Sequence, residues 1–325
     1  MHVYLPSIVM EMGCLLPYEG DAFFKCSLAE PISCIVAGLR ASYHNAQAAH
    51  EHIQGIVDGG AMLLMAGCGA MGLGCVDIVC HSPERRPRLL VVTDADDGRL
   101  ARASRMFGLA YKDGRADGAI NGVEVHFVNT GGMAEPVAAL KAFNGGGCFD
   151  DIFVMAAVPA LLSQCSDLLA YDGCLNFFAG PTDKNLTAAF NFYNVHYMMH
   201  HVAANSGSLV CDMVDSVDWI GKGILHPEVM ITHVGGLDSV ADATLNLLKV
   251  PGGKRLVYTH VSMPMTAIAD FAEKGKSDPF FAELDRIYSA NNGLWCKEAD
   301  DYLLANARRV EIGELKEFIK ERRGF

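Results

Sequence analysis

Three glycines with a characteristic spacing, Gly67, Gly69 and Gly72, follow directly on a short apolar run. In the pattern G-x-G-x-x-G the first glycine allows a tight turn, the second lets a phosphate group approach the backbone, and the third lets a helix pack closely on a strand. The amides of a helix that begins here, including those of Ala70 and Met71, would face a pyrophosphate at the positive end of the helix dipole. The pattern predicts a dinucleotide-binding turn, although similar turns occur in methyltransferases and as structural loops.

An acidic residue stands at the expected distance beyond this turn. Asp94 ends the next apolar run, 22 residues after the last glycine (94 − 72), and about 20 residues is the usual spacing to an acid that accepts hydrogen bonds from ribose hydroxyls. A carboxylate there would repel the extra phosphate of NADP, so the sequence favours NAD. Arg99 would cover the adenine side of the cofactor or lie solvated on a helix, and spacing leaves both open. Asp96 and Asp97 are expected in the first turn of that helix.

Histidines and cysteines show no comparable pattern. His50-Glu51-His52 is expected at the surface, because on a helix alternate residues point about 200° apart. His200-His201 is interpreted as two neighbours on a strand. The 11 cysteines include no C-x-x-C pair, which predicts reduced, mostly buried thiols. Cys34 and Cys68 have no base at a recognisable spacing, so packing is favoured over nucleophilic chemistry.

The elements that must position these residues follow from alternating runs between about residue 60 and residue 210. Apolar β-branched runs alternate with amphipathic stretches, which is typical of parallel βαβ units. The expected strands are 62–65, 89–93, 123–129, 152–155, 175–179 and 200–203, with helices at 71–80, 98–107, 135–143 and 160–170. Ser208 is expected to cap a further helix. The fold class predicted is α/β, with a doubly wound parallel sheet.

Flanking segments are less regular. The sequence predicts an apolar helix over residues 32–42 and, beyond Gly223, a strand at 229–233, a helix near 239–248 and a strand at 255–259. Later helices are separated by Asn291-Asn292-Gly293.

Length and composition set further bounds. The chain has 325 residues, of which 51% are hydrophobic and 20% charged, which is typical of a globular protein with more than one structural unit. The formal net charge of −12 argues against a nucleic-acid partner, which needs clustered Lys and Arg. No apolar run reaches the roughly 18 residues of a membrane span, and the N-terminus lacks the features of a signal peptide. A cytoplasmic protein without a membrane partner is expected.

Taken together, these motifs resemble the medium-chain, zinc-type alcohol and polyol dehydrogenases. Besides the glycine turn, the resemblance is carried by Val91-Val92-Thr93-Asp94, Arg99-Leu100-Ala101-Arg102-Ala103, Asn205-Ser206-Gly207-Ser208, and Ile231-Thr232-His233 followed by Leu237. A closer resemblance, over nearly the whole chain, is to the L-sorbose 1-phosphate reductase branch of that family. Its motifs are Glu30-Pro31-Ile32-Ser33-Cys34, Ala41-Ser42-Tyr43-His44 and Asn291-Asn292-Gly293-Leu294-Trp295.

The resemblance implies a Rossmann domain, NAD and a zinc ion. Family members hold zinc in an N-terminal GroES-like catalytic domain, with a cysteine, a Gly-His-Glu segment and often a further carboxylate. The Gly-His-Glu segment and the family's four-cysteine lobe are absent here, so most of that domain is expected to be missing and the zinc site incomplete. Glu30 matches the carboxylate of the family's Glu-Pro step, at or beside the zinc, and is the expected catalytic and metal residue. A glutamate before proline is also common in a helix's first turn.

Three domains and one reaction follow as expectations. Residues 1–37 would be a remnant of the catalytic domain, 38–225 the Rossmann domain, and 226–325 the C-terminal part of the catalytic domain with a helical tail. The reaction would be hydride transfer between NAD and a sugar, polyol or sugar phosphate, in a homo-oligomer, with activity limited by the missing ligands. Two alternatives stay open: a catalytically silent dinucleotide-binding protein, and another Rossmann enzyme such as a methyltransferase.

Overall fold

The computed structural model describes residues 4–247 and 249–310. The chain divides into two compact units, Met1–Pro227 and Glu228–Phe325. Among the described residues, no helix combines the length and the hydrophobicity needed to cross a lipid bilayer.

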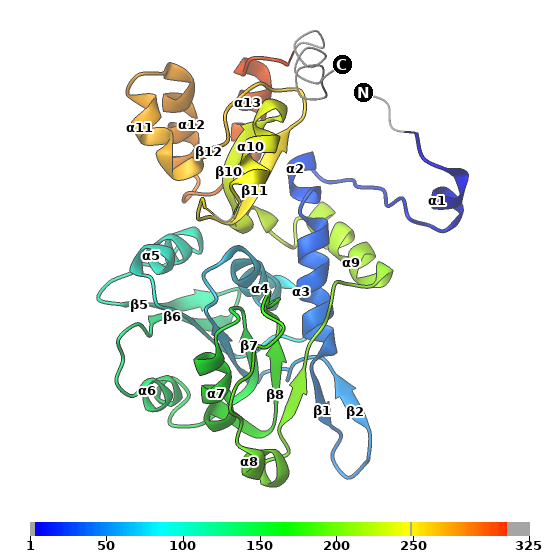
Figure 1. Ribbon diagram of the computed structural model, residues 1–325, viewed down its shortest axis with the longest axis vertical. Helices are drawn as coiled ribbons and strands as arrows, with labels where there is room; N and C mark the ends of the chain where they lie inside the picture. Colours follow the sequence, from blue (N-terminus) through cyan, green and yellow to red (C-terminus); the bar gives the residue numbers. More distant parts are fainter. Residues whose placement is uncertain (1–3, 248, 311–325) are drawn as a thin grey trace. The chain divides into compact units, whose positions relative to one another are not determined.

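The first unit is built on a seven-stranded sheet with the strand order β5-β6-β4-β3-β7-β8-β9. Figure 1 labels β5, β6, β7 and β8 of this sheet. All neighbouring strands are parallel except β5 and β6, which are antiparallel. The strands are β3 (Ala61–Met65), β4 (Leu89–Asp94), β5 (Arg115–Ile120), β6 (Val123–Asn129), β7 (Phe149–Val154), β8 (Leu169–Phe177) and β9 (His201–Ala203). The predicted α/β class with its doubly wound sheet is confirmed.

Helices cover both faces of this sheet, as its apolar strands require. They are α3 (Ala29–Ala41), α4 (Ala70–His81), α5 (Asp97–Met106), α6 (Pro136–Ala142), α7 (Pro159–Leu168) and α9 (Val210–Gly221). Alternate residues of β3 and β4, such as Leu63 and Val91, pack with Leu140 of α6 and Leu162 of α7 in one buried cluster. Helix α3 packs against α4 and α9.

Several elements depart from the sequence-based expectation. Strand β5 was not predicted, and it pairs with β6 from Arg115 opposite Val128 to Ile120 opposite Val123. His52 begins a strand instead of lying on a helix: β1 (Tyr43–Asn45) and β2 (His52–Gln54) form an antiparallel hairpin, and His50 to His52 are exposed as expected. The remaining elements of the unit are α1 (Ser7–Glu11), α2 (Phe23–Cys26) and α8 (Phe192–Tyr197).

The expected cap of α9 is also wrong by one residue. The N-cap is Leu209, whose backbone amide donates to the Asp212 carboxylate (2.8 Å). The Ser208 hydroxyl instead shares a hydrogen bond with the Ser33 hydroxyl (2.8 Å), which ties α9 to α3.

The second unit has a three-stranded sheet of order β11-β10-β12. Its elements are β10 (Ile231–Gly236), α10 (Val240–Leu245), β11 (Lys254–Tyr258), β12 (Thr266–Ala267), α11 (Phe271–Gly275), α12 (Pro279–Ala290) and α13 (Lys297–Asn306). Trp295 and Phe271 are buried in it, and the Trp295 indole donates to the Tyr258 hydroxyl (2.9 Å). Residue 248 of the expected helix and the part of the expected helical tail beyond residue 310 lie outside the described residues.

Candidate functional site

The glycine turn connects the end of β3 to the start of α4, in the middle of the sheet. The amide of Gly67 donates to the carbonyl of Thr93 (2.8 Å), so the turn is fixed to the end of β4. Ala66, just before it, has a left-handed backbone (φ 55°). Gly69 is the N-cap of α4, and no side chain caps this helix. The first amides of α4, at Ala70 and Met71, therefore have no intrahelical acceptor and suit an anion.

Each of the three glycines has a different steric environment. A Cβ on Gly67 would lie 2.7 Å from Val92 Cγ1, and one on Gly72 would lie 2.2 Å from the carbonyl oxygen of Gly67. A Cβ at position 72 would collide with backbone, whereas one at position 67 would require the Val92 and Leu64 side chains to shift. A Cβ on Gly69 would meet no heavy atom within 4 Å, so the backbone there faces open space. That space, beside the uncapped helix, fits the pyrophosphate of a dinucleotide.

Asp94 is the last residue of β4, the strand next to β3, and is only 7% exposed. Its Oδ1 accepts hydrogen bonds from the amides of Ala95 (2.9 Å) and Asp96 (3.2 Å). The carboxylate is thus held in place at the mouth of the turn, with a second oxygen for further hydrogen bonds. Because β3, β4 and β7 are parallel, their carboxyl ends share one edge, and β3 and β7 flank the point where the strand order reverses, which is where open α/β sheets bind ligands.

The helix acids and Arg99 lie beside this edge. Asp96 is the N-cap of α5 and not a first-turn residue, since its Oδ1 accepts from the amide of Arg99 (2.9 Å). Asp97 is in the first turn and accepts from the side-chain amide of Asn129 (2.7 Å). Burial raises the pKa of the Cys68 thiol, Asp94 adds to the rise, and the positive charge of Arg99 acts against it. Cys68 is therefore a neutral buried thiol, and the Arg99 side chain is exposed.

Glu30 lies at another place on the same edge. It is the second residue of α3, it is exposed, and its Oε1 accepts from the thiol of Cys34 (3.3 Å). The Cys34 carbonyl accepts from the side-chain amide of Asn205 (3.0 Å), in the loop that follows β9. This contact places the start of α3 at the carboxyl end of β9, three strands and about 14 Å across the sheet from β3.

The surroundings of Glu30 do not fit a catalytic zinc ion. A zinc site in a protein has three or four side-chain ligands. Within residues 4–247 and 249–310, Glu30 belongs to no group of three His, Cys, Asp or Glu side chains close enough to share one ion. The described residues around Glu30 therefore offer no zinc site through which a reaction could run.

A buried histidine–aspartate pair at the amino edge of the sheet was not predicted from the sequence. His44 Nε2 lies 3.1 Å from Asp151 Oδ1, and His44 Nδ1 lies 2.8 Å from the carbonyl oxygen of Asp172. The other Asp151 oxygen accepts from the amide of Val57 (2.8 Å). A cavity of about 1120 Å³ opens beside His44, but it lies at the amino edge, away from the glycine turn, so it is not the dinucleotide site.

This pair should make stability depend on pH. Burial acts to lower the pKa of His44, but the hydrogen bond to Asp151 and the Asp151 charge outweigh it and raise the pKa. Because the folded pKa lies above the unfolded value of about 6.5, the contribution is fully present below about pH 6.5 and is lost as pH rises through the folded pKa. In His44→Asn, the unfolding free energy should lose this component, on the order of 1 kcal/mol.

Urea unfolding at a series of pH values measures the free energy of unfolding of the unchanged chain and of His44→Asn. The difference between these two free energies should be larger at pH 6 than at pH 9. His50→Asn, at an exposed position, is the matched control and should change nothing. A difference that grows with pH would contradict the assigned charge state.

Comparison with curated proteins finds three relatives that align with most of this chain. The uncharacterized protein YggP of Escherichia coli (strain K12) is 47% identical over 313 residues, which are 96% of this chain and 72% of YggP. Mannitol-1-phosphate 5-dehydrogenase of Aliivibrio fischeri is 45% identical, over 92% of this chain and 69% of the relative. L-sorbose 1-phosphate reductase of Klebsiella pneumoniae is 38% identical, over 95% and 70%. This chain belongs to the medium-chain, zinc-type dehydrogenases. No family model matches it.

Solved structures show the fold of this medium-chain dehydrogenase in other proteins. The NADH complex of the alcohol dehydrogenase rspB of E. coli CFT073 has a TM-score of 0.55 at 17% identity, over 74% of this chain and 60% of that one. The 2R,3R-butanediol dehydrogenase of Bacillus subtilis has a TM-score of 0.57 at 16% identity, over 75% and 60%. At these identities the likeness shows the fold alone. The chain spans about 60% of the length of these solved proteins.

Proposed function

We propose that this chain binds NAD and takes part in hydride transfer between the nicotinamide and a sugar, polyol or sugar phosphate. The observation that carries the proposal is the glycine turn: open space at Gly69, an uncapped α4, and the fixed carboxylate of Asp94 at one edge of the sheet. Two of the relatives are named for sugar or polyol monophosphates, which supports that substrate class.

Each cofactor residue has a definite task in this proposal. The amides of Ala70, Met71 and Gly72 bind the pyrophosphate, because they lie at the uncapped start of α4. The second oxygen of Asp94 accepts hydrogen bonds from the adenosine ribose and repels a 2′-phosphate. Arg99 covers the adenine side. When bound, NAD supplies the hydride acceptor, and the protein holds and orients it.

Glu30 is proposed as the carboxylate at the reacting end. It is exposed on the same edge as the turn, at the far side of β7 and β8. An exposed carboxylate there can orient a substrate hydroxyl and exchange its proton with water. Glu30 forms no metal site with its described neighbours. This observation favours a second candidate function, a dinucleotide-binding protein with weak or absent turnover.

The test is a titration of the 325-residue chain with NADH, followed by nicotinamide fluorescence, with S-adenosylmethionine as competitor. Saturable NADH binding without competition is the expected result. Oxidation of mannitol 1-phosphate and reduction of L-sorbose 1-phosphate are then followed at the NADH absorbance, with Glu30→Gln alongside. Turnover that falls in Glu30→Gln with unchanged NADH affinity supports hydride transfer.

Other outcomes separate the alternatives. NADH binding without turnover of either substrate assigns the silent dinucleotide-binding protein. Displacement of NADH by S-adenosylmethionine, or failure of NADH to bind a folded chain, would overturn the proposal.

A further inference from the structure

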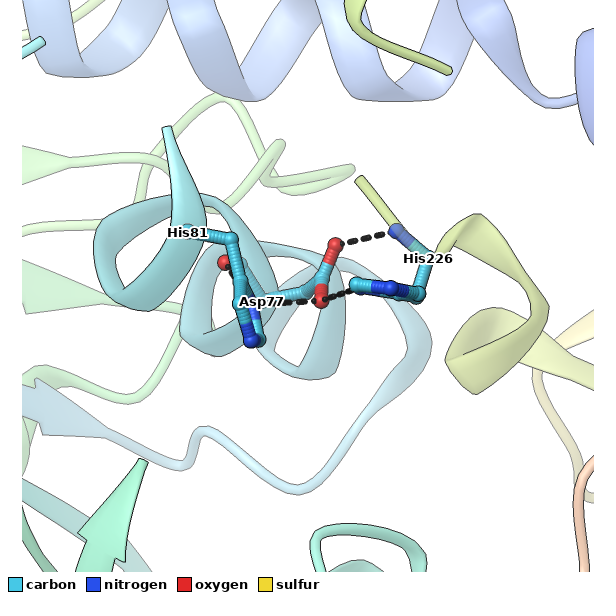
Figure 2. A group of neighbouring side chains, drawn as sticks. All are labelled: Asp77, His81 and His226. Carbon is cyan, nitrogen blue, oxygen red and sulfur yellow. Dashed lines mark hydrogen bonds and ion pairs between the residues drawn. The ribbon is translucent and has the colours of Figure 1, made fainter. Parts of the chain in front are cut away.

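The end of α4 remote from the glycine turn carries an unusual group of side chains. Asp77 and His81 are four residues apart on the helix, so their side chains lie on one face. His226 comes from the segment after α9 and reaches the same place. Figure 2 shows the Asp77 carboxylate between the two imidazole rings.

One carboxylate oxygen is the centre of this group. Asp77 Oδ1 lies 3.0 Å from Nδ1 of His81 and 3.0 Å from Nδ1 of His226. Asp77 Oδ2 accepts a hydrogen bond from the backbone amide of His226 (2.6 Å). The two rings are 4.9 Å apart at 69° to one another. The three candidate ligand atoms all lie within 4.8 Å of one another.

We propose that Asp77 Oδ1, His81 Nδ1 and His226 Nδ1 bind one divalent transition-metal ion, of which Zn²⁺ is the best match. Zinc bonds to imidazole nitrogen and carboxylate oxygen are about 2.0–2.2 Å long, which in a tetrahedron puts ligand atoms about 3.3 Å apart. The observed separations of 3.0 Å from Asp77 Oδ1 are within about 0.3 Å of that spacing. Nδ1 of His81 also lies 2.9 Å from the Asp77 carbonyl oxygen, a contact that a bound ion would replace. Imidazole with carboxylate is a donor set for zinc, copper or nickel, and unsuited to calcium.

Charge and burial favour a cation at this place. The Asp77 side chain is only 1% exposed, and a buried carboxylate requires compensation. The group lies in the last turns of α4, where the helix dipole favours a positive charge.

The site is open to an ion and held by a surrounding contact. The side chains of His81 and His226 are 23% and 44% exposed, so an ion can enter and a water molecule can fill the fourth position. The amide of His226 on Asp77 Oδ2 fixes the carboxylate orientation, as outer hydrogen bonds do in metal sites. Asp77 is seven residues, or about 10 Å, along α4 from Ala70, and none of the three residues belongs to the proposed cofactor site.

The expected consequence is structural. An ion bound here would join α4 to the segment after α9, so part of its binding free energy would become folding free energy of the first unit. Zinc should therefore raise the melting temperature of the chain, and the increase should be lost in His226→Ala.

Titration of the metal-free 325-residue chain with Co²⁺ gives the direct test, because the absorption spectrum of bound Co²⁺ depends on its ligands. One Co²⁺ per chain should produce visible d–d bands without the near-ultraviolet sulfur-to-cobalt band, and Zn²⁺ should displace it. His81→Ala and His226→Ala should each weaken binding by more than about 100-fold, since even the loss of an outer partner costs about 10- to 100-fold. His50→Ala, at an exposed histidine, is the matched control and should bind as the unchanged chain does.

Three results would overturn the proposal. The first is the absence of visible bands in the folded chain. The second is a sulfur-to-cobalt band, which would place the ion on some of the 11 cysteines. The third is binding that survives in both histidine variants. Far-ultraviolet circular dichroism checks that each variant folds. If a variant does not fold, the Co²⁺ absorption spectrum of the unchanged chain alone tests the proposed site.

Discussion

Gly72→Ala is expected to destabilise the first unit severely and to abolish NADH binding, whereas Gly69→Ala should keep the fold and lose cofactor affinity. At position 72 the new methyl would lie 2.2 Å from the Gly67 carbonyl oxygen and 2.7 Å from the Gly67 Cα. Those atoms are backbone, so α4 must move away from the turn, and overpacking of this kind costs about 1–3 kcal/mol or more. At position 69 the methyl meets no protein atom, and instead occupies the approach of the pyrophosphate.

Urea unfolding and NADH fluorescence separate the two effects, and each variant is the control for the other. Gly69→Ala should lose no more than about 1 kcal/mol of stability, the scale of an N-cap change, while its affinity for NADH falls roughly tenfold or more, about 1.4 kcal/mol. Equal losses of stability in both variants, or full affinity in Gly69→Ala, would mean that the turn does not contact the pyrophosphate.

Asp94→Ala is expected to weaken NADH binding by about 10- to 100-fold, the range of a hydrogen bond to a charged group, and to remove the preference for NADH over NADPH. Asp94 Oδ1 also holds the amides of Ala95 and Asp96. Asp94→Asn retains an oxygen for those amides but removes the negative charge. This variant therefore shows how much of the lost affinity is due to the charge and how much to the order of the loop. In that variant NADPH should gain affinity relative to NADH.

The same fluorescence titration, run with both cofactors, measures this preference. Asp113→Ala is the matched control, because its carboxylate is exposed on a loop and 86% accessible. Tighter binding of NADPH than of NADH by the unchanged chain would overturn the assignment of NAD.

Local patterns in the sequence were sufficient to predict the central elements of the site. Buried apolar runs identify β3 and β4 because both faces of a parallel sheet are covered, and glycine spacing locates the turn between β3 and α4. Strand β5 escaped prediction because Asp117 and Gly118 interrupt it and much of it faces solvent. Its pairing with β6, rather than its own composition, makes it a strand.

Contacts between distant residues could not be predicted from spacing. His44 and Asp151 are 107 residues apart, and Asp77 and His226 are 149 apart. Each pair exists only because the tertiary fold brings elements from distant parts of the chain together. The Ser208 hydroxyl illustrates the same limit, since a local rule assigned it to a helix cap and the tertiary partner Ser33 engages it instead.

Ala66, the left-handed residue before the glycine turn, has a consequence for the thermodynamics of cofactor binding. A non-glycine residue in that conformation costs about 1–2 kcal/mol, and hydrogen bonds from Ala66 and Gly67 to Thr93 hold it there. An alanine has fewer backbone states than a glycine, so the turn already occupies a narrow set of conformations before any ligand arrives. The backbone of the turn therefore loses little conformational entropy when a dinucleotide binds, and a larger part of the interaction energy remains as binding free energy.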